Sequence, residues 1–84
     1  MSTIDKLKQD LKGRPRTFNW SDMRRLLLSV GYAENTSGKT SGSRFRFTHK
    51  TAVPIVLHKP HPGNDMKQYA VKLVAELLEQ EGLL

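Results

Sequence analysis

The chain has 84 residues, which is enough for one small domain and leaves no room for a second hydrophobic core. Its 14 lysines and arginines outnumber 8 aspartates and glutamates, and the net charge of +6 favours polyanionic partners. Nucleic acid comes first among these, followed by an acidic protein or an anionic membrane surface. The absence of cysteine excludes disulfides and thiol chemistry. Because the sequence has neither a signal-peptide pattern nor a long apolar run, we expect a soluble cytoplasmic protein.

A first helix is expected over residues 2–12. Its apolar residues recur at the i, i+3 and i+7 positions of an amphipathic helix: Ile4, Leu7 and Leu11. Ser2 or Thr3 can cap the start of this helix, and the glycine and proline that follow residue 12 end it.

The second predicted helix has clear boundary signals. Asn19 is a suitable N-cap, Phe18 and Met23 occupy the two positions of a hydrophobic staple, and Gly31 is a natural C-terminal stop. An apolar stripe follows the helical period: Trp20, Met23, Leu26, Leu27 and Val30. We expect this stripe, with Trp20, to lie in the core rather than to stack on bases.

Three strands are expected next, separated by polar turns: residues 32–36, 43–49 and 53–58. In the second strand Phe45 and Phe47 share one face, and in the third strand Ile55 and Leu57 do so, together with Val53. Proline cannot donate a hydrogen bond to a neighbouring strand, so Pro54 favours either an edge position for the third strand or a site that faces away from the neighbouring strand.

The most regular pattern predicts a final helix that is capped by Asn64 and ended by Gly82, with Asp65 in its first turn. Its apolar residues follow the i, i+3, i+4 and i+7 spacing: Met66, Tyr69, Ala70, Leu73, Val74, Leu77 and Leu78. We expect this stripe to be buried, and Tyr69 to be a core residue.

This order of elements predicts an α+β fold. Strands joined by short turns pair antiparallel, and two amphipathic helices can cover one face of the three-stranded sheet in a two-layer sandwich. A turn at residues 50–52 pairs Phe45 with Leu57 and Phe47 with Ile55. The opposite face of the sheet is left open.

The same alternation predicts the side chains on the open face. Arg44 lies opposite His58 and Arg46 lies opposite Val56, with Cβ atoms about 4.5–5.5 Å apart. A cation and a titratable imidazole are therefore expected side by side. The simpler interpretation is that the two arginines only keep an exposed strand soluble.

RNA cleavage needs a base for the 2′-hydroxyl, positive charge for the phosphorane and often an acid for the leaving oxygen, and it needs no metal or cofactor in principle. We expect three catalytic candidates on this basis: His58, His61 and Arg44. The side chains expected to contact RNA are Lys39, Ser43, Arg44, Arg46 and Lys59.

Two other histidine patterns are weaker. His49 shares the face of the phenylalanines, which favours a structural or turn role. The pair His58 and His61 has the spacing of some metal ligands, but it lacks a nearby cysteine or a free carboxylate, so no metal site is predicted.

Two stretches, 26–32 (LLLSVGY) and 40–47 (TSGSRFRF), resemble the HicA toxins of bacterial toxin–antitoxin pairs. The resemblance continues through 56–61 and the last helix, so it covers about residues 18–84 and leaves 1–17 as an N-terminal helical extension. It implies a fold similar to the double-stranded-RNA-binding domain. It also implies an mRNA endoribonuclease that needs no metal or other cofactor and is neutralised by a HicB-like antitoxin.

The chain departs from the family pattern at one position. The catalytic histidine of the family follows the Gly-Ser pair, and here that position is Arg44. Either a histidine elsewhere serves as the base, or the domain binds without cutting. The second alternative is a non-catalytic RNA-binding module or a protein-interaction module of the same fold.

Overall fold

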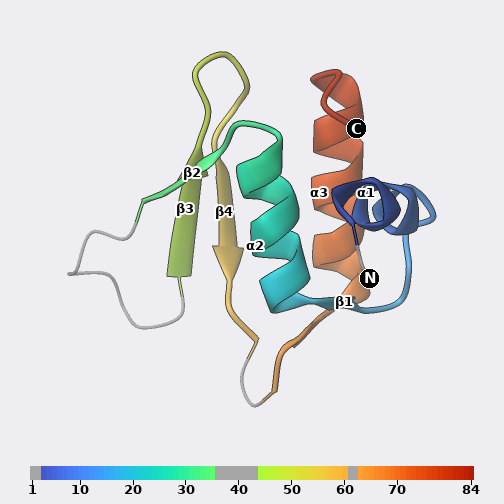
Figure 1. The fold of residues 1–84 in the computed structure, drawn as a ribbon. Coiled ribbons are helices and arrows are strands. Elements are labelled where there is room, and N and C mark those ends of the chain that lie inside the picture. Colours follow the sequence, from blue (N-terminus) through green and yellow to red (C-terminus); the bar gives the residue numbers. More distant parts are fainter. Residues whose placement is uncertain (1–2, 36–43, 61–62) are drawn as a thin grey trace.

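The computed structural model describes residues 3–35, 44–60 and 63–84. Within this part the chain forms three helices and five strands: α1 (Ile4–Lys12), β1 (Phe18–Asn19), α2 (Trp20–Ser29), β2 (Ala33–Asn35), β3 (Arg44–Thr48), β4 (Ile55–His58), β5 (Asp65–Met66) and α3 (Gln68–Gln80). Figure 1 shows the β2-β3-β4 sheet beside α2 and α3, with α1 against the two helices. The predicted α+β class is confirmed. No described helix is long and apolar enough to cross a membrane.

The second helix starts and ends where the sequence predicts. The Asn19 side-chain oxygen accepts hydrogen bonds from the backbone amides of Ser21, at 2.9 Å, and Asp22, at 3.3 Å. The helix is followed by Gly31 at φ 107°, a left-handed conformation that a residue with a Cβ atom adopts only at a cost. Both ends of α2 are therefore fixed by local chemistry.

The helix-facing side of the sheet is packed into one hydrophobic core. Phe47 is fully buried, and Ile55 and Leu57 are 4% and 3% exposed. The Trp20 ring lies 5.3 Å from the Phe45 ring and 6.3 Å from the Phe47 ring, measured between centroids, so the start of α2 packs on β3. The predicted core positions of Trp20, Phe47, Ile55 and Leu57 are confirmed.

The first helix joins the same core. Leu7 and Leu11 are buried, and Thr3 caps the helix by accepting a hydrogen bond from the Lys6 amide at 3.3 Å. Beyond its end, Arg14 forms a bidentate ion pair with Glu79 of α3, at 2.8 and 3.0 Å. The predicted extension is thus packed on α2 and α3 rather than separate from them.

The third predicted strand is shorter than expected. β4 begins at Ile55, and Val53 lies outside it and is 46% exposed, so its predicted place among the buried residues is wrong. The Val53 carbonyl instead accepts a 2.8 Å hydrogen bond from the Tyr32 hydroxyl. β4 forms an edge of its sheet in the described part of the chain, which is one of the two arrangements that Pro54 favours.

The start of the final helix is also corrected. Asn64 does not cap α3; its carbonyl accepts a 2.7 Å hydrogen bond from the Trp20 amide. Asp65 and Met66 form β5, which pairs antiparallel with β1, and the helix begins at Gln68. The predicted place of Asp65 in the first turn of the helix is therefore wrong. Two-residue strands carry no periodic signal, and the buried Met66 continues the helical pattern by coincidence.

The buried face of α3 is rotated from the predicted stripe. The fully buried residues are Val71, Val74, Ala75 and Leu78, whereas Tyr69 and Leu73 are 72% and 56% exposed. The expectation that Tyr69 and Leu73 are buried in the core is wrong. Apolar residues cover a wide arc of this helix, and the core covers only part of the arc. The pattern alone did not indicate which part.

Candidate active site

The pairing of β3 with β4 brings a guanidinium and an imidazole together on the open face. The register is Arg44 opposite His58, Phe45 opposite Leu57, Arg46 opposite Val56 and Phe47 opposite Ile55. All four predicted pairs are confirmed. Both Arg44 and His58 are exposed, so a polyanion can reach them from solvent.

Other basic groups extend this site. Arg46 is exposed one pair further along the sheet, and Lys59 is exposed directly after β4. Among the described residues no carboxylate forms an ion pair with Arg44 or Arg46. The positive charge of this face therefore remains available to phosphate groups.

The strands that carry this site are anchored to α2 through the opposite face of the sheet. Glu34 of β2 lies opposite Phe47, on the face away from the arginines, and its carboxylate accepts a 2.7 Å bond from Nε of Arg24 in α2. Together with the packing of Trp20 on Phe45, this ion pair anchors β2 and β3 to α2. The open-face side chains thus project from a sheet that is fixed on its other face.

His49 has a structural role, as its position in the alternation predicts. Its Nδ1 accepts hydrogen bonds from the backbone amides of Thr51 and Ala52, both at 3.1 Å. Because Nδ1 accepts, the ring proton is on Nε2, which donates to the Val30 carbonyl at 3.0 Å. With both ring nitrogens engaged, His49 fixes the turn before β4 and is not available for catalysis.

Three predicted site residues lie outside the part of the chain that the structure describes: Lys39, Ser43 and His61. The described candidates are Arg44, Arg46, His58 and Lys59. Their roles in binding or catalysis rest on the chemistry of this arrangement. In the described ranges no three histidine or carboxylate side chains cluster as metal ligands would.

A groove that the sequence did not predict lies beside the same histidine. It has a volume of about 470 Å³ and runs between β4 and the first turns of α3. Its lining includes Val56, His58, Lys59, Lys67, Tyr69 and Leu73. We call it the β4–α3 groove. The signal that could have found it is the apolar arc of the last helix, which is wider than burial against one layer requires.

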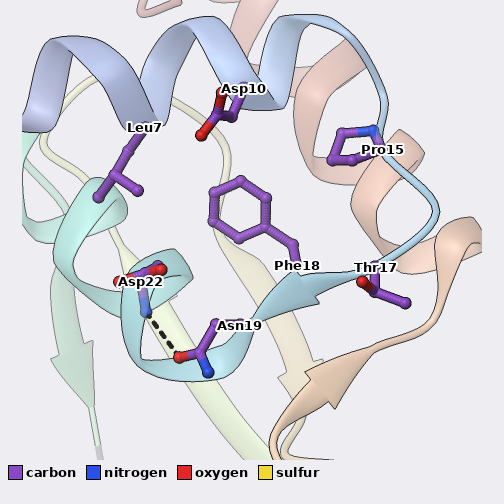
Figure 2. Close-up of a pocket in the computed structure, with 7 residues that line it drawn as sticks. All are labelled: Leu7, Asp10, Pro15, Thr17, Phe18, Asn19 and Asp22. Carbon is purple, nitrogen blue, oxygen red and sulfur yellow. Dashed lines mark hydrogen bonds between the residues drawn. The ribbon is translucent and has the colours of Figure 1, made fainter. Parts of the chain in front are cut away.

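A smaller hollow of about 260 Å³ lies between α1 and the start of α2. Figure 2 shows the Phe18 ring pointing into it between Leu7 and Asp10, with the Asn19 cap and Asp22 at its edge. The carboxylates of Asp10 and Asp22 disfavour phosphate there. The hollow also contains none of the basic open-face residues, so it is a poor candidate for an RNA site.

Comparisons with known proteins bear on this geometry. A family model described as the HicA toxin of bacterial toxin–antitoxin systems matches residues 20–83. The matched region begins at the first residue of α2 and includes the whole β2-β3-β4 sheet and α3. Searches of curated proteins and of solved structures returned no match.

Proposed function

Since the chain belongs to the HicA family of toxins of bacterial toxin–antitoxin systems, we propose that it is an mRNA endoribonuclease whose active site is the open face of β3 and β4. The observation that carries this proposal is the register that sets Arg44 opposite His58. A general base and a cation for the phosphate then stand on neighbouring strands, and both are open to a large substrate.

The reaction follows from these groups. His58, as neutral imidazole, accepts the proton of the ribose 2′-hydroxyl, and the 2′-oxygen attacks the adjacent phosphorus. Arg44 stabilises the charge that grows on the phosphoryl oxygens. The bond from phosphorus to the 5′-oxygen breaks, and the leaving oxygen takes a proton from an acid, a role we assign to His61. The products are a 2′,3′-cyclic phosphate and a 5′-hydroxyl end.

Substrate binding is assigned to the basic groups around this pair. Arg46 and Lys59 extend the positive charge on either side of Arg44 and His58, and Lys39 and Ser43 precede Arg44 in the chain. Phosphate contacts of this kind give affinity without reading sequence. A HicB-like antitoxin is the proposed partner that keeps the toxin inactive.

A second candidate function is binding without cleavage. The observation that favours it is Arg44 itself, because the family resemblance places a histidine at this position. An arginine holds phosphate well but is not a general base near neutral pH. On this alternative, the open face binds RNA or an acidic partner, and His58 is one more polar surface residue.

The two functions are separated by incubating the purified chain with a long unstructured RNA in the presence of EDTA. Cleavage that persists with chelator and yields cyclic phosphate ends supports the histidine mechanism. Retention of intact RNA on the protein, with no cleavage, supports the binding module. An inactive Arg44→Ala and His58→Ala double variant, purified in the same way, controls for contaminating ribonuclease.

A further inference from the structure

The β4–α3 groove contains an unusual share of exposed apolar surface. In the described part of the chain, five large hydrophobic side chains are exposed, and three of them line this groove: Val56 at 45%, Tyr69 at 72% and Leu73 at 56%. Scattered apolar residues are normal on a surface, but a contiguous set around a hollow marks an interaction site.

The groove follows the edge of a strand rather than one face of the sheet. Val56 and Leu57 point to opposite faces of β4, yet both line the groove together with His58. The sheet order is β2-β3-β4, and among the described residues no strand pairs with the outer edge of β4. Backbone groups on that edge can therefore pair with an added strand.

The charges around the groove indicate that an added strand would carry acidic residues. Lys59 and Lys67 are exposed residues of its lining, which also includes His58 and Val56. Asp65 is the single carboxylate among the described residues of the lining. A strand that alternates acidic residues with apolar ones would place its carboxylates near the lysines and an apolar side chain against Tyr69 and Leu73.

We propose that the β4–α3 groove is the docking site of the antitoxin, which adds an acidic, extended segment to the outer edge of β4. The inference rests on the proposed partner and names the surface that this partner uses. A strand in this position lies about 4.8 Å from β4 and next to His58, so it denies RNA access to the Arg44–His58 pair. Inhibition then follows from occupancy, without a change in the toxin fold.

RNA is the less favoured occupant. A base could stack on Tyr69, and the lysines could bind phosphate. The exposed Leu73 and Val56, however, provide neither charge nor hydrogen bonds for a polynucleotide. An apolar side chain of a protein partner would bury them. A protein strand accounts for the open edge, the apolar lining and the two exposed lysines together.

The test uses the full chain and a purified HicB-like antitoxin, with affinity measured by isothermal titration calorimetry. Leu73→Glu should weaken binding about 30-fold or more, the loss typical of a residue at the centre of an interface. The matched control is Leu28→Glu, which alters an exposed leucine of α2 outside the groove and should leave affinity within twofold. Hydrogen exchange should show new protection of β4 amides in the complex.

Several results would overturn the inference. Equal affinity for Leu73→Glu and the parent chain removes the groove from the interface, and β4 amides that stay unprotected exclude strand addition. Loss of RNA binding with unchanged antitoxin affinity assigns the groove to RNA. If Leu73→Glu instead converts a dimer of the chain into a monomer, the occupant is a second copy. Antitoxin affinity is measured without RNA and RNA cleavage without antitoxin, so failure of this inference and failure of the endoribonuclease proposal are distinguishable.

Discussion

The nine residues of β3 and β4 present two different faces, one buried in the core and one that carries the proposed active site. On one face Phe47, Ile55 and Leu57 are nearly or fully buried in the core, and on the other Arg44 and His58 are exposed. The residues alternate along the same strands, so each face can change without directly altering the contacts of the other. Substitutions on the buried face should therefore unfold the protein, and substitutions on the open face should leave it folded but inactive.

The largest effect is expected on the buried face. Phe47→Ala removes a fully buried ring that Trp20 packs against, and it should lower the free energy of unfolding by about 3–5 kcal/mol. Urea denaturation followed by circular dichroism measures this loss. Arg46→Ala, on the neighbouring residue of the same strand, should change stability by no more than about 0.5 kcal/mol. Similar losses for the two variants would contradict the division between faces.

The next effect concerns the contact between α2 and the turn before β4. Gly31 has φ 107°, and a Cβ atom there would come within 2.7 Å of His49 Nε2. Gly31→Ala should destabilise the protein by at least about 1–2 kcal/mol, from the backbone conformation alone. Gly82→Ala is the control, since Gly82 also has a positive φ, 75°, but no atom within 4 Å of the added Cβ. Thermal melts that fall equally for both would show that the His49 contact is unimportant.

On the open face, the expected effect is on affinity and its salt dependence. RNA binding should weaken as salt rises, with a slope in log–log form of about −0.7 per phosphate contacted on a single strand. Arg44→Ala, Arg46→Ala and Lys59→Ala should each reduce that slope, whereas Lys6→Ala and Lys12→Ala in α1 should alter it less. Fluorescence anisotropy with a labelled RNA measures these slopes. An affinity that is flat from low to moderate salt would rule out a phosphate-contacting surface.

The smallest effect concerns the attachment of α1. The hydrogen-bonded Arg14 guanidinium lowers the pKa of Glu79 below its ordinary value, so the ion pair stabilises the fold when the carboxylate is ionised. That contribution is present above the ordinary carboxylate pKa and is lost as the pH falls through the lowered value. Glu79→Gln should flatten the acid limb of the stability profile slightly, because the pair is partly exposed. An unchanged profile would show that the pair contributes nothing measurable.

The sequence predicted the β3–β4 pair well because strict alternation and one turn length determine its register. The aromatic residues of β3 and the apolar residues of β4 share a face only if the pairing of the strands shifts by an even number of residues. Every such pairing near the observed one puts Arg44 opposite His58 or diagonal to it. The structural role of His49 follows from the same alternation. The α2 boundaries were also predictable, because they depend on local backbone interactions. Asn19 caps the first amides of the helix, and Gly31 adopts the positive φ that follows its end.

The last helix was predicted less well for a physical reason. Its apolar residues cover a wide arc, and the buried part of that arc is chosen by tertiary contacts with α1, α2 and the sheet. Tyr69 and Leu73 fall outside the buried part, and the short β1–β5 pair that delays the helix until Gln68 has no sequence signature of its own. The wide apolar arc indicates that some apolar residues of α3 stay exposed, and the three-dimensional structure shows that Tyr69 and Leu73 line the β4–α3 groove.

The role of His58 as the base is tested most directly by comparing RNA cleavage, RNA binding and stability of His58→Ala with those of the parent chain, all without antitoxin. We expect His58→Ala to lose cleavage of an unstructured RNA in EDTA and to lose the growth arrest caused by expression in cells. Its RNA affinity and unfolding midpoint should stay close to those of the parent, whereas Arg44→Ala should weaken both cleavage and binding. If His58→Ala cleaves RNA and arrests growth as well as the parent chain, His58 is not the base, and His61 becomes the next residue to replace.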